Sequence, residues 1–527
     1  AAAAAAYGDG AGGDGDVDAT RVSDSRGGAR RLSLRGARTP KDPLYARQWH
    51  LHSSIDVNVN AAWAQGFNGT GVTVCVVDDG LQKVHPDLKD NFKSEHSYDF
   101  NGMDADVRPS PNIDDHGTSA AGACCAVNNL ASGGRSAASF CGVGTAYGAR
   151  VTAVRLISDA TEDWQEAKGV AYHINENDVY SASWGPPDDG RRLEGPGPLA
   201  QAARRRALNT GRHGKGNIYV WAAGNGRSKG DNCNYDGWAN DIGALTVGAL
   251  SQTGRQPWYS ENCASMFGVA PSSGGRSAIG TTDLLGRWGS SNGDCTTTFG
   301  GTSAAAPIAA GIVALVLSVR PELTWRDVQG VFVEAGRKVD HRNADWQRNG
   351  GGHDVSHRYG FGLIDAAMAV ATAREWRLYA GVGSVASPSH HAGLPMAMAR
   401  NQHYDVTWAP SAADVAGRRV LHVECDVWVS TRYRGAVAVD LYSPHGTRSP
   451  LAEIRADTGR DINNWRFVSV MNWDEPAGGE WRVKFTLGAR ADASTRLRSW
   501  KLTLHTYTAG GLLDDADADA DAGARNG

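Results

Sequence analysis

The segment Val72-Thr-Val-Cys-Val-Val-Asp-Asp-Gly80 is the strongest indication of the fold, because a short apolar run leads directly into two acids and a glycine. Such a continuous run, bounded by a turn signal, is typical of a strand that is buried on both faces. Similar runs lie at residues 151–157 and 217–223, and a helix-like stretch lies at 199–210. Strands that alternate with helices predict an α/β fold with a mostly parallel sheet.

The pattern changes after Trp376, where short β-rich stretches separated by turn signals such as Glu475-Pro-Ala-Gly-Gly479 replace the alternation. This second pattern predicts an all-β sandwich. We therefore predict four segments: a disordered linker at 1–41, an α/β domain at 42–374, a β-sandwich at 375–508 and an acidic, disordered tail at 509–527.

Composition gives no support for nucleic-acid binding or for a membrane-spanning segment. The formal net charge of −4 gives no support for nucleic-acid binding. The longest apolar run, residues 308–319, is shorter than a bilayer span and suits a buried helix, so we expect no membrane anchor in this chain. The chain opens on six alanines without the apolar core of a signal peptide, and we therefore expect it to be a fragment.

Three segments each place a reactive group where a strand or a loop ends. They are Val76-Val-Asp-Asp-Gly80, Asp115-His-Gly-Thr118 and Gly300-Gly-Thr-Ser-Ala-Ala-Ala-Pro307. We expect Pro307 in the first turn of an apolar helix, where its missing N–H is not needed.

These segments together predict a catalytic triad. A serine hydroxyl becomes nucleophilic when an imidazole takes its proton, and that imidazole needs a carboxylate to orient it. Taken singly, an aspartate that ends a strand is usually a turn former, and Gly-Thr-Ser is usually a helix cap. In combination they indicate Asp78, His116 and Ser303, in the chain order of subtilisin.

A fourth group completes the chemistry. Trp221-Ala-Ala-Gly-Asn-Gly226 ends a predicted strand with an asparagine amide. The tetrahedral intermediate of acyl transfer needs preorganised donors for its oxyanion. We predict that Asn225 is one donor and the backbone N–H of Ser303 the other.

Longer motifs resemble the kexin/furin proprotein convertases, which are subtilisin-like serine proteases. The motifs are Tyr180-Ser-Ala-Ser-Trp-Gly-Pro-Pro-Asp-Asp-Gly190, Pro257-Trp-Tyr-Ser-Glu261 and Val355-Ser-His-Arg-Tyr-Gly-Phe-Gly362. Looser motifs, such as Leu441-Tyr-Ser-Pro-His-Gly-Thr447, resemble the P domain of that family. The resemblance implies a calcium-dependent serine endopeptidase of the secretory pathway or the extracellular space, with protein precursors as substrates, cut after paired or multiple basic residues.

Two alternatives stay open. One is a subtilisin-like protease of broader specificity, and the other is a catalytically inactive binding protein on the same scaffold. The complete triad and Asn225 argue against the inactive protein.

The resemblance also implies which acids read the basic side chains, since arginine pairs with carboxylates. They are Asp188 and Asp236 for the residue before the cut, Asp79 and Asp114 for the second position, and Glu166 and Glu194 for the fourth. The segment Ile113-Asp-Asp-His116 departs from the family by shifting or losing one acid, so we expect altered stringency at the second position.

The same resemblance implies Ca²⁺, a hard cation that prefers carboxylate and carbonyl oxygens. The implied ligands are Asp42, Asp87, Val127, Asn129 and Gly142 in a first site, and Asp188, Asp231 and Glu261 in a second. An apparent insertion at 131–139 falls within the loop of the first site.

The cysteines are expected to form two disulfide bonds and four free thiols. The resemblance implies disulfides between Cys141 and Cys295 and between Cys233 and Cys263, which fit an oxidising compartment. The remaining cysteines are expected as thiols: Cys75, Cys124, Cys125 and Cys425.

Relatives are made as zymogens that their own propeptide inhibits, so we expect a cut after Arg38 in Arg35-Gly-Ala-Arg38, with Arg30-Arg31 as the alternative.

Overall fold

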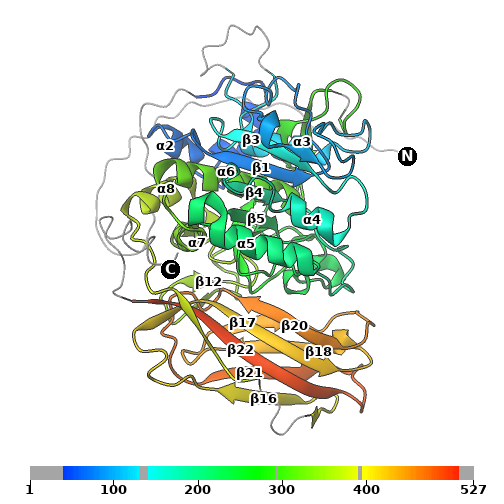
Figure 1. Ribbon diagram of the computed structural model, residues 1–527, viewed down its shortest axis with the longest axis vertical. Coiled ribbons are helices and arrows are strands. Elements are labelled where there is room, and N and C mark those ends of the chain that lie inside the picture. The colour runs from blue at the N-terminus through cyan, green and yellow to red at the C-terminus, as the bar shows by residue number, and fades with distance from the viewer. Residues whose placement is uncertain (1–38, 130–139, 292, 390–394, 510–527) are drawn as a thin grey trace, which may run out of the picture. The chain divides into compact units, whose positions relative to one another are not determined.

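The structure is a computed structural model that describes residues 39–129, 140–291, 293–389 and 395–509 (Figure 1). The predicted processing residues Arg35 and Arg38, the insertion at 131–139 and nearly all of the acidic tail lie outside these described residues.

A nine-stranded sheet forms the framework, and it is parallel except for the pair of strands at one edge. Its order is β10-β13-β7-β6-β5-β4-β1-β3-β2. The strands are β1 (Thr73–Asp78), β2 (Tyr98–Asp99), β3 (Arg150–Arg155), β4 (Val179–Ala182), β5 (Ile218–Ala222), β6 (Ala244–Leu250), β7 (Met266–Pro271), β10 (Gly336–Arg337) and β13 (Leu363–Ile364). The prediction of a mostly parallel α/β sheet is confirmed. The apolar run at 72–77 supplies most of β1, which lies inside the sheet between β3 and β4.

Helices cover this sheet, and Figure 1 shows α4 and α5 in front of it. The helices are α1 (Trp49–His52), α2 (Val59–Trp63), α3 (His116–Cys125), α4 (Asp163–Gly169), α5 (Pro198–Gly214), α6 (Thr302–Val319), α7 (Trp325–Glu334) and α8 (Ala366–Glu375). Two small antiparallel pairs, β8 (Ile279–Thr282) with β9 (Cys295–Phe299) and β11 (Gln347–Arg348) with β12 (Asp354–Val355), lie outside the main sheet.

Helix α6 corrects two expectations. It is the one helix among the described residues that is long and apolar enough to cross a membrane by length and composition, although no such run was expected. It is 83% buried inside the protein, so the prediction of a buried helix at 308–319 is confirmed. Pro307 is its sixth residue, beyond the first turn, so the carbonyl of Ser303 loses its helical donor. The Ser183 hydroxyl donates to that carbonyl instead, at 3.3 Å.

The remaining described chain forms two antiparallel sheets. One contains β14 (Gly383–Ala386), β15 (Met396–Ala397), β17 (Arg418–Ser430), β20 (Ile462–Ser469) and β22 (Arg496–Thr508). The other contains β16 (His403–Trp408), β18 (Val437–Tyr442), β19 (Arg448–Ala452) and β21 (Trp481–Leu487). Alternate residues of β18 and β21 are buried, which is the pattern of a sheet with one face on a core. The β-rich second half is thus confirmed, whereas the exact domain limits stay a prediction.

Candidate active site

Asp78 and His116 meet at the carboxyl end of β1. Asp78 is the last residue of this buried strand, and His116 is the first residue of α3. Nδ1 of His116 lies 2.9 and 3.0 Å from the two carboxylate oxygens of Asp78. A carboxylate only accepts hydrogen bonds, so Nδ1 carries the proton and Nε2 has a lone pair for a nucleophile.

Gly117 lets α3 begin this close to β1. A Cβ at this position would overlap the carbonyl oxygen of Gly80 and lie 2.9 Å from the Cβ of Asp78. The close approach explains physically why a glycine must follow the histidine in Asp115-His-Gly-Thr118.

Ser303 is the second residue of α6, and Gly301 just before this helix has a φ of +72°, which favours glycine. The ring of His116 packs edge-on against Phe299, which ends β9 shortly before Ser303, with centroids 5.5 Å apart. The fold therefore brings the histidine segment and the serine segment together.

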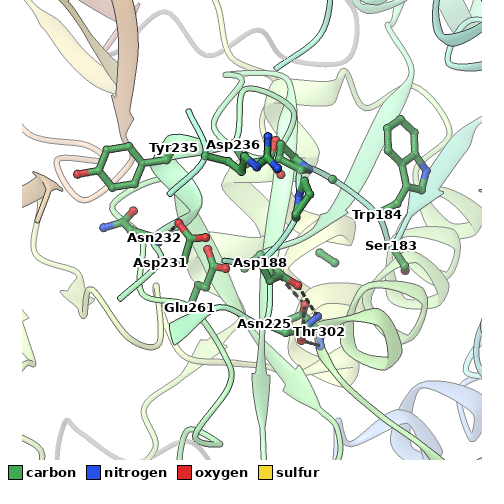
Figure 2. A pocket seen from close by; sticks show the side chains of 17 residues that line it. Ser183, Trp184, Asp188, Asn225, Asp231, Asn232, Tyr235, Asp236, Glu261 and Thr302 are labelled. Atoms are coloured by element: carbon green, nitrogen blue, oxygen red, sulfur yellow. Dashed lines mark hydrogen bonds between the residues drawn. The ribbon is translucent and has the colours of Figure 1, made fainter. Parts of the chain in front are cut away.

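Asn225 follows β5 and is oriented by the residue next to Ser303. Its Oδ1 accepts hydrogen bonds from the backbone N–H of Thr302 at 2.8 Å and from the Thr302 hydroxyl at 3.1 Å (Figure 2). With Oδ1 held in this way, the amide nitrogen is the end left to donate, and it lies 3.5 Å from a carboxylate oxygen of Asp188. Thr302 thus positions the Asn225 amide, a role that was not predicted although Thr302 lies in the Gly-Thr-Ser motif.

A cavity of about 250 Å³ opens beside Asn225 and Thr302. Both acids predicted for the residue before the cut, Asp188 and Asp236, line it, as Figure 2 shows. Burial raises the pKa of Asp236 to about 7, although the N–H of Trp238 donates to its carboxylate at 2.7 Å. A carboxylate with a raised pKa at the wall of a cavity is a candidate partner for a cationic ligand.

For the second position, the prediction for Asp114 is wrong. Its carboxylate is buried and binds Arg155 at 2.9 Å and the Ser158 hydroxyl at 2.7 Å, so it does not face the solvent. The cause is Arg155 at the end of β3, whose buried guanidinium needs anionic partners. Asp79 accepts the backbone N–H groups of His116 and Gly117, at 3.1 and 2.7 Å, and so holds the start of α3.

The two acids predicted for the fourth position lie near each other. Glu166 lies in α4, and burial raises its pKa, with smaller contributions from Asp163 and Glu194. Glu194 forms a β-bridge with Asp236, which lines the cavity beside Asn225. Their contact with a substrate stays a prediction.

The second implied calcium site fits a divalent cation by its charges. Asp188, Asp231 and Glu261 line one side of the same cavity, and burial, followed by the charges of the two aspartates, raises the pKa of Glu261 well above its usual value. Arg455 pairs with Asp231 at 2.7 Å. Three carboxylates and one guanidinium leave a formal charge of minus two, which one Ca²⁺ would neutralise with the oxygen ligands that it prefers.

The first implied site also shows a feature that a cation would explain. The Oδ2 atom of Asp42 is buried and has no hydrogen-bond partner among the residues that the structure describes. The amide nitrogen of Asn129 donates to Oδ1 of Asp42 at 2.8 Å and to Oδ1 of Asp87 at 2.7 Å, so the two carboxylates converge. Val127 borders the site through its N–H, which donates to the Asp87 carbonyl at 2.9 Å, and Gly142 packs against Gln48.

Both implied disulfides are present, Cys141–Cys295 and Cys233–Cys263. The second joins the segment that carries Asp231 and Asp236 to the segment that follows Glu261. The other cysteines are buried thiols, as expected: Cys75, Cys124, Cys125 and Cys425.

The acids around His116 give a prediction for pH. Burial lowers the pKa of His116, but the charges of Asp78, Asp79 and Asp115 outweigh it and raise the pKa above its ordinary 6.5. A general base must be neutral, so kcat/KM should rise with pH through this pKa. Asp115→Asn removes one of the three charges and should move the acid limb to lower pH by about 0.5 unit.

The measurement is a pH profile of kcat/KM with a peptide whose charge is constant over the range. Asp115 is a suitable site because its side chain makes no capping bond to α3. Asp90→Asn, at an exposed position, serves as the control and should leave the limb in place. An unchanged limb, or a limb at higher pH, in the Asp115→Asn protein would contradict the assignment of His116 as the base.

Comparison with known proteins agrees with this geometry. The subtilase family model matches residues 69–362, and the proprotein convertase P-domain model matches residues 420–504. Among curated relatives, mouse "Proprotein convertase subtilisin/kexin type 4" is 41% identical, over 86% of this chain and 68% of that protein. The human type 7 enzyme is 39% identical over 88% of this chain and 60% of that protein, and rat furin is 39% identical over 90% and 59%.

The chain thus spans about three fifths to two thirds of the length of these relatives. Among solved structures, a serine protease of Aeromonas sobria has a TM-score of 0.77 and covers 90% of this chain and 97% of its own. Its 24% sequence identity limits that likeness to the fold.

Proposed function

Because this chain belongs to the subtilase family, in its proprotein convertase branch, and is thereby a subtilisin-like serine endopeptidase, we propose that it cleaves precursor proteins after paired or multiple basic residues in a calcium-dependent manner. The observation that carries the specificity is the acid-lined cavity beside Asn225.

In the proposed reaction, Ser303 Oγ attacks the scissile carbonyl while Nε2 of His116 takes its proton. Asp78 holds the imidazole and stabilises its charged form through Nδ1. The amide nitrogen of Asn225 and the backbone N–H of Ser303 bind the oxyanion, and His116 then protonates the leaving amine. Water hydrolyses the acyl-enzyme by the same steps.

The cavity supports a basic residue before the cut. Asp236 is half-buried, and its carboxylate has no lysine or arginine within salt-bridge distance among the described residues. A substrate guanidinium or ammonium would provide that charge, and charge-assisted hydrogen bonds of this kind are the strong ones. Asp188 lies on the Asn225 side of the same cavity, near the proposed scissile bond.

Calcium would supply the positive charge that the carboxylates of Asp188, Asp231 and Glu261 lack. Glu261 also accepts the backbone N–H of Gly226 at 2.8 Å, directly after Asn225 in the chain. A cation that holds the Glu261 side chain in place would therefore also help to orient Asn225, the proposed oxyanion donor.

The compartment and the maturation step rest on the relatives. We propose the secretory pathway or the extracellular space, which suits two disulfides. We further propose that the chain is cut after Arg38 and that its own propeptide inhibits it until release.

A cleavage profile with and without a calcium chelator tests the proposal. We expect an Arg-Xaa-Lys-Arg peptide to be hydrolysed at least about 30-fold faster than Ala-Ala-Pro-Phe, because the loss of one partner of a buried charge pair costs about 2–5 kcal/mol. EGTA should lower both this activity and the midpoint of thermal unfolding, and excess Ca²⁺ should restore both.

Equal rates on the two peptides would favour the protease of broader specificity. If neither peptide is hydrolysed and no fluorophosphonate labels Ser303, the protein is the catalytically inactive binding protein. Full activity in EGTA with an unchanged unfolding midpoint would contradict calcium dependence.

A further inference from the structure

Arg455 follows β19 in the β-sandwich, yet its side chain is completely buried against the segment that carries Asp231. Its Nη1 binds Oδ1 of Asp231 at 2.7 Å, and its Nη2 binds Asp457 of the sandwich at 2.8 Å. Its guanidinium carbon lies 3.5 Å from the centre of the Tyr235 ring.

The same guanidinium reaches a second loop, because Nη2 also donates to the carbonyl of Arg192. Arg192 lines the cavity and lies between Asp188 and Glu194 in the sequence. Arg455 therefore contacts both segments that form the acidic cavity: the one with Asp188 and the one with Asp231.

Neighbouring contacts reinforce this junction. Arg434 donates to the carbonyl of Arg191 at 2.9 Å and binds Asp457 at 2.6 Å, so the two arginines share one carboxylate. The hydroxyl of Tyr235 donates to the carbonyl of Glu453 at 2.9 Å. The wall of the cavity is thus held from the sandwich by several directed bonds.

We propose that Arg455 is a positioning residue for the substrate pocket: its guanidinium joins the Asp188 loop to the Asp231 segment and so fixes the spacing of the acids that bind the basic side chain. This inference rests on the proposed function, because it concerns how that pocket binds. A planar fork with several donors can satisfy such partners simultaneously, which a single ammonium cannot do. A pocket whose walls are already in place loses less conformational entropy when the substrate binds.

Arg455→Met tests the proposal, because it keeps the length and apolar stem of the side chain but removes the fork. We expect KM for an Arg-Xaa-Lys-Arg peptide to rise at least 10-fold, with kcat changed less than 3-fold, since binding in the pocket is shared by ground and transition states. Labelling of Ser303 by a small uncharged fluorophosphonate should keep the wild-type rate.

The matched control is Arg482→Met. Arg482 also pairs with an aspartate, Asp405 at 3.2 Å, and stacks on a tyrosine, Tyr442 at 4.1 Å, but both partners belong to the sandwich. This variant should resemble the wild type in KM, kcat and labelling.

A loss of peptide hydrolysis and labelling in equal proportion would show a merely structural role and overturn the proposal, as would an unchanged KM. If Arg455→Met does not fold, Arg455→Lys decides: it keeps the charge without the fork, and a wild-type KM would overturn the proposal. Failure of the proposed function is distinguishable, because the wild-type protein itself would then show no preference for basic peptides.

Discussion

Replacing Ser303 by alanine is expected to lower kcat for peptide hydrolysis by about a million-fold, the scale on which loss of a triad serine acts. The variant removes the nucleophile but leaves the oxyanion donors, so a small residual rate above that of water should remain. Alanine is the best helix former, and the substitution lies in the first turn of α6, so the fold should be unaffected.

The measurement is hydrolysis of a fluorogenic Arg-Xaa-Lys-Arg peptide, together with thermal unfolding. Ser318→Ala at the other end of the same helix is the control, because its hydroxyl donates to the carbonyl of Leu315 within α6. The Ser303→Ala protein should also keep its segment before Thr39 if the cut after Arg38 is made by the enzyme itself. Residual activity of a tenth or more of the wild-type rate would contradict Ser303 as the nucleophile.

Replacing Asp236 by asparagine should lower kcat/KM for substrates with arginine before the cut by about 30- to 5,000-fold, because the loss of one partner of a buried charge pair costs about 2–5 kcal/mol. Asparagine keeps a carbonyl oxygen that can accept the N–H of Trp238, so the local fold should persist. Removing a carboxylate whose pKa the fold raises, and which has no cationic partner among the described residues, should leave the unfolding midpoint unchanged or raise it.

The decisive quantity is the ratio of kcat/KM for a peptide with arginine before the cut to that for a peptide with phenylalanine there. Asp189→Asn provides the control, since Asp189 adjoins Asp188, pairs with Arg192 at 3.3 Å and does not line the cavity. The ratio should collapse in Asp236→Asn and stay within a few-fold of wild type in Asp189→Asn. A parallel fall on both peptides would remove Asp236 from the recognition of the basic side chain.

Much of the fold and the centre of the site could be predicted because their signals are local. The run that became β1 is continuous, and Asp78 follows it directly. His116 and Ser303 stand in motifs whose glycines have a steric reason, such as Gly117 against Gly80. Residues adjacent in sequence share these constraints, so they are readable without knowledge of distant partners.

The wrong predictions concern residues whose partners lie far away in the sequence. The carboxylate of Asp114 pairs with the buried guanidinium of Arg155, which lies 41 residues further along the chain. Pro307 lies beyond the first turn of its helix and depends on the Ser183 hydroxyl, 120 residues away from the carbonyl that it leaves unpaired. The folded core determines which charge or hydrogen-bond donor a side chain contacts. The sequence pattern around a residue does not indicate such a distant partner.

Local sequence patterns were therefore enough to predict the α/β fold with its β-rich second half, and they also predicted the reactive groups Asp78, His116, Ser303 and Asn225. Which carboxylates remain available to a ligand depends on long-range contacts that form when the chain folds. The tertiary structure gathers Asp188, Asp231, Asp236 and Glu261 around one cavity and directs Asp114 to Arg155. It also brings Arg455 to Asp231 across 224 residues, because a buried charge is stable only where the fold supplies its partner.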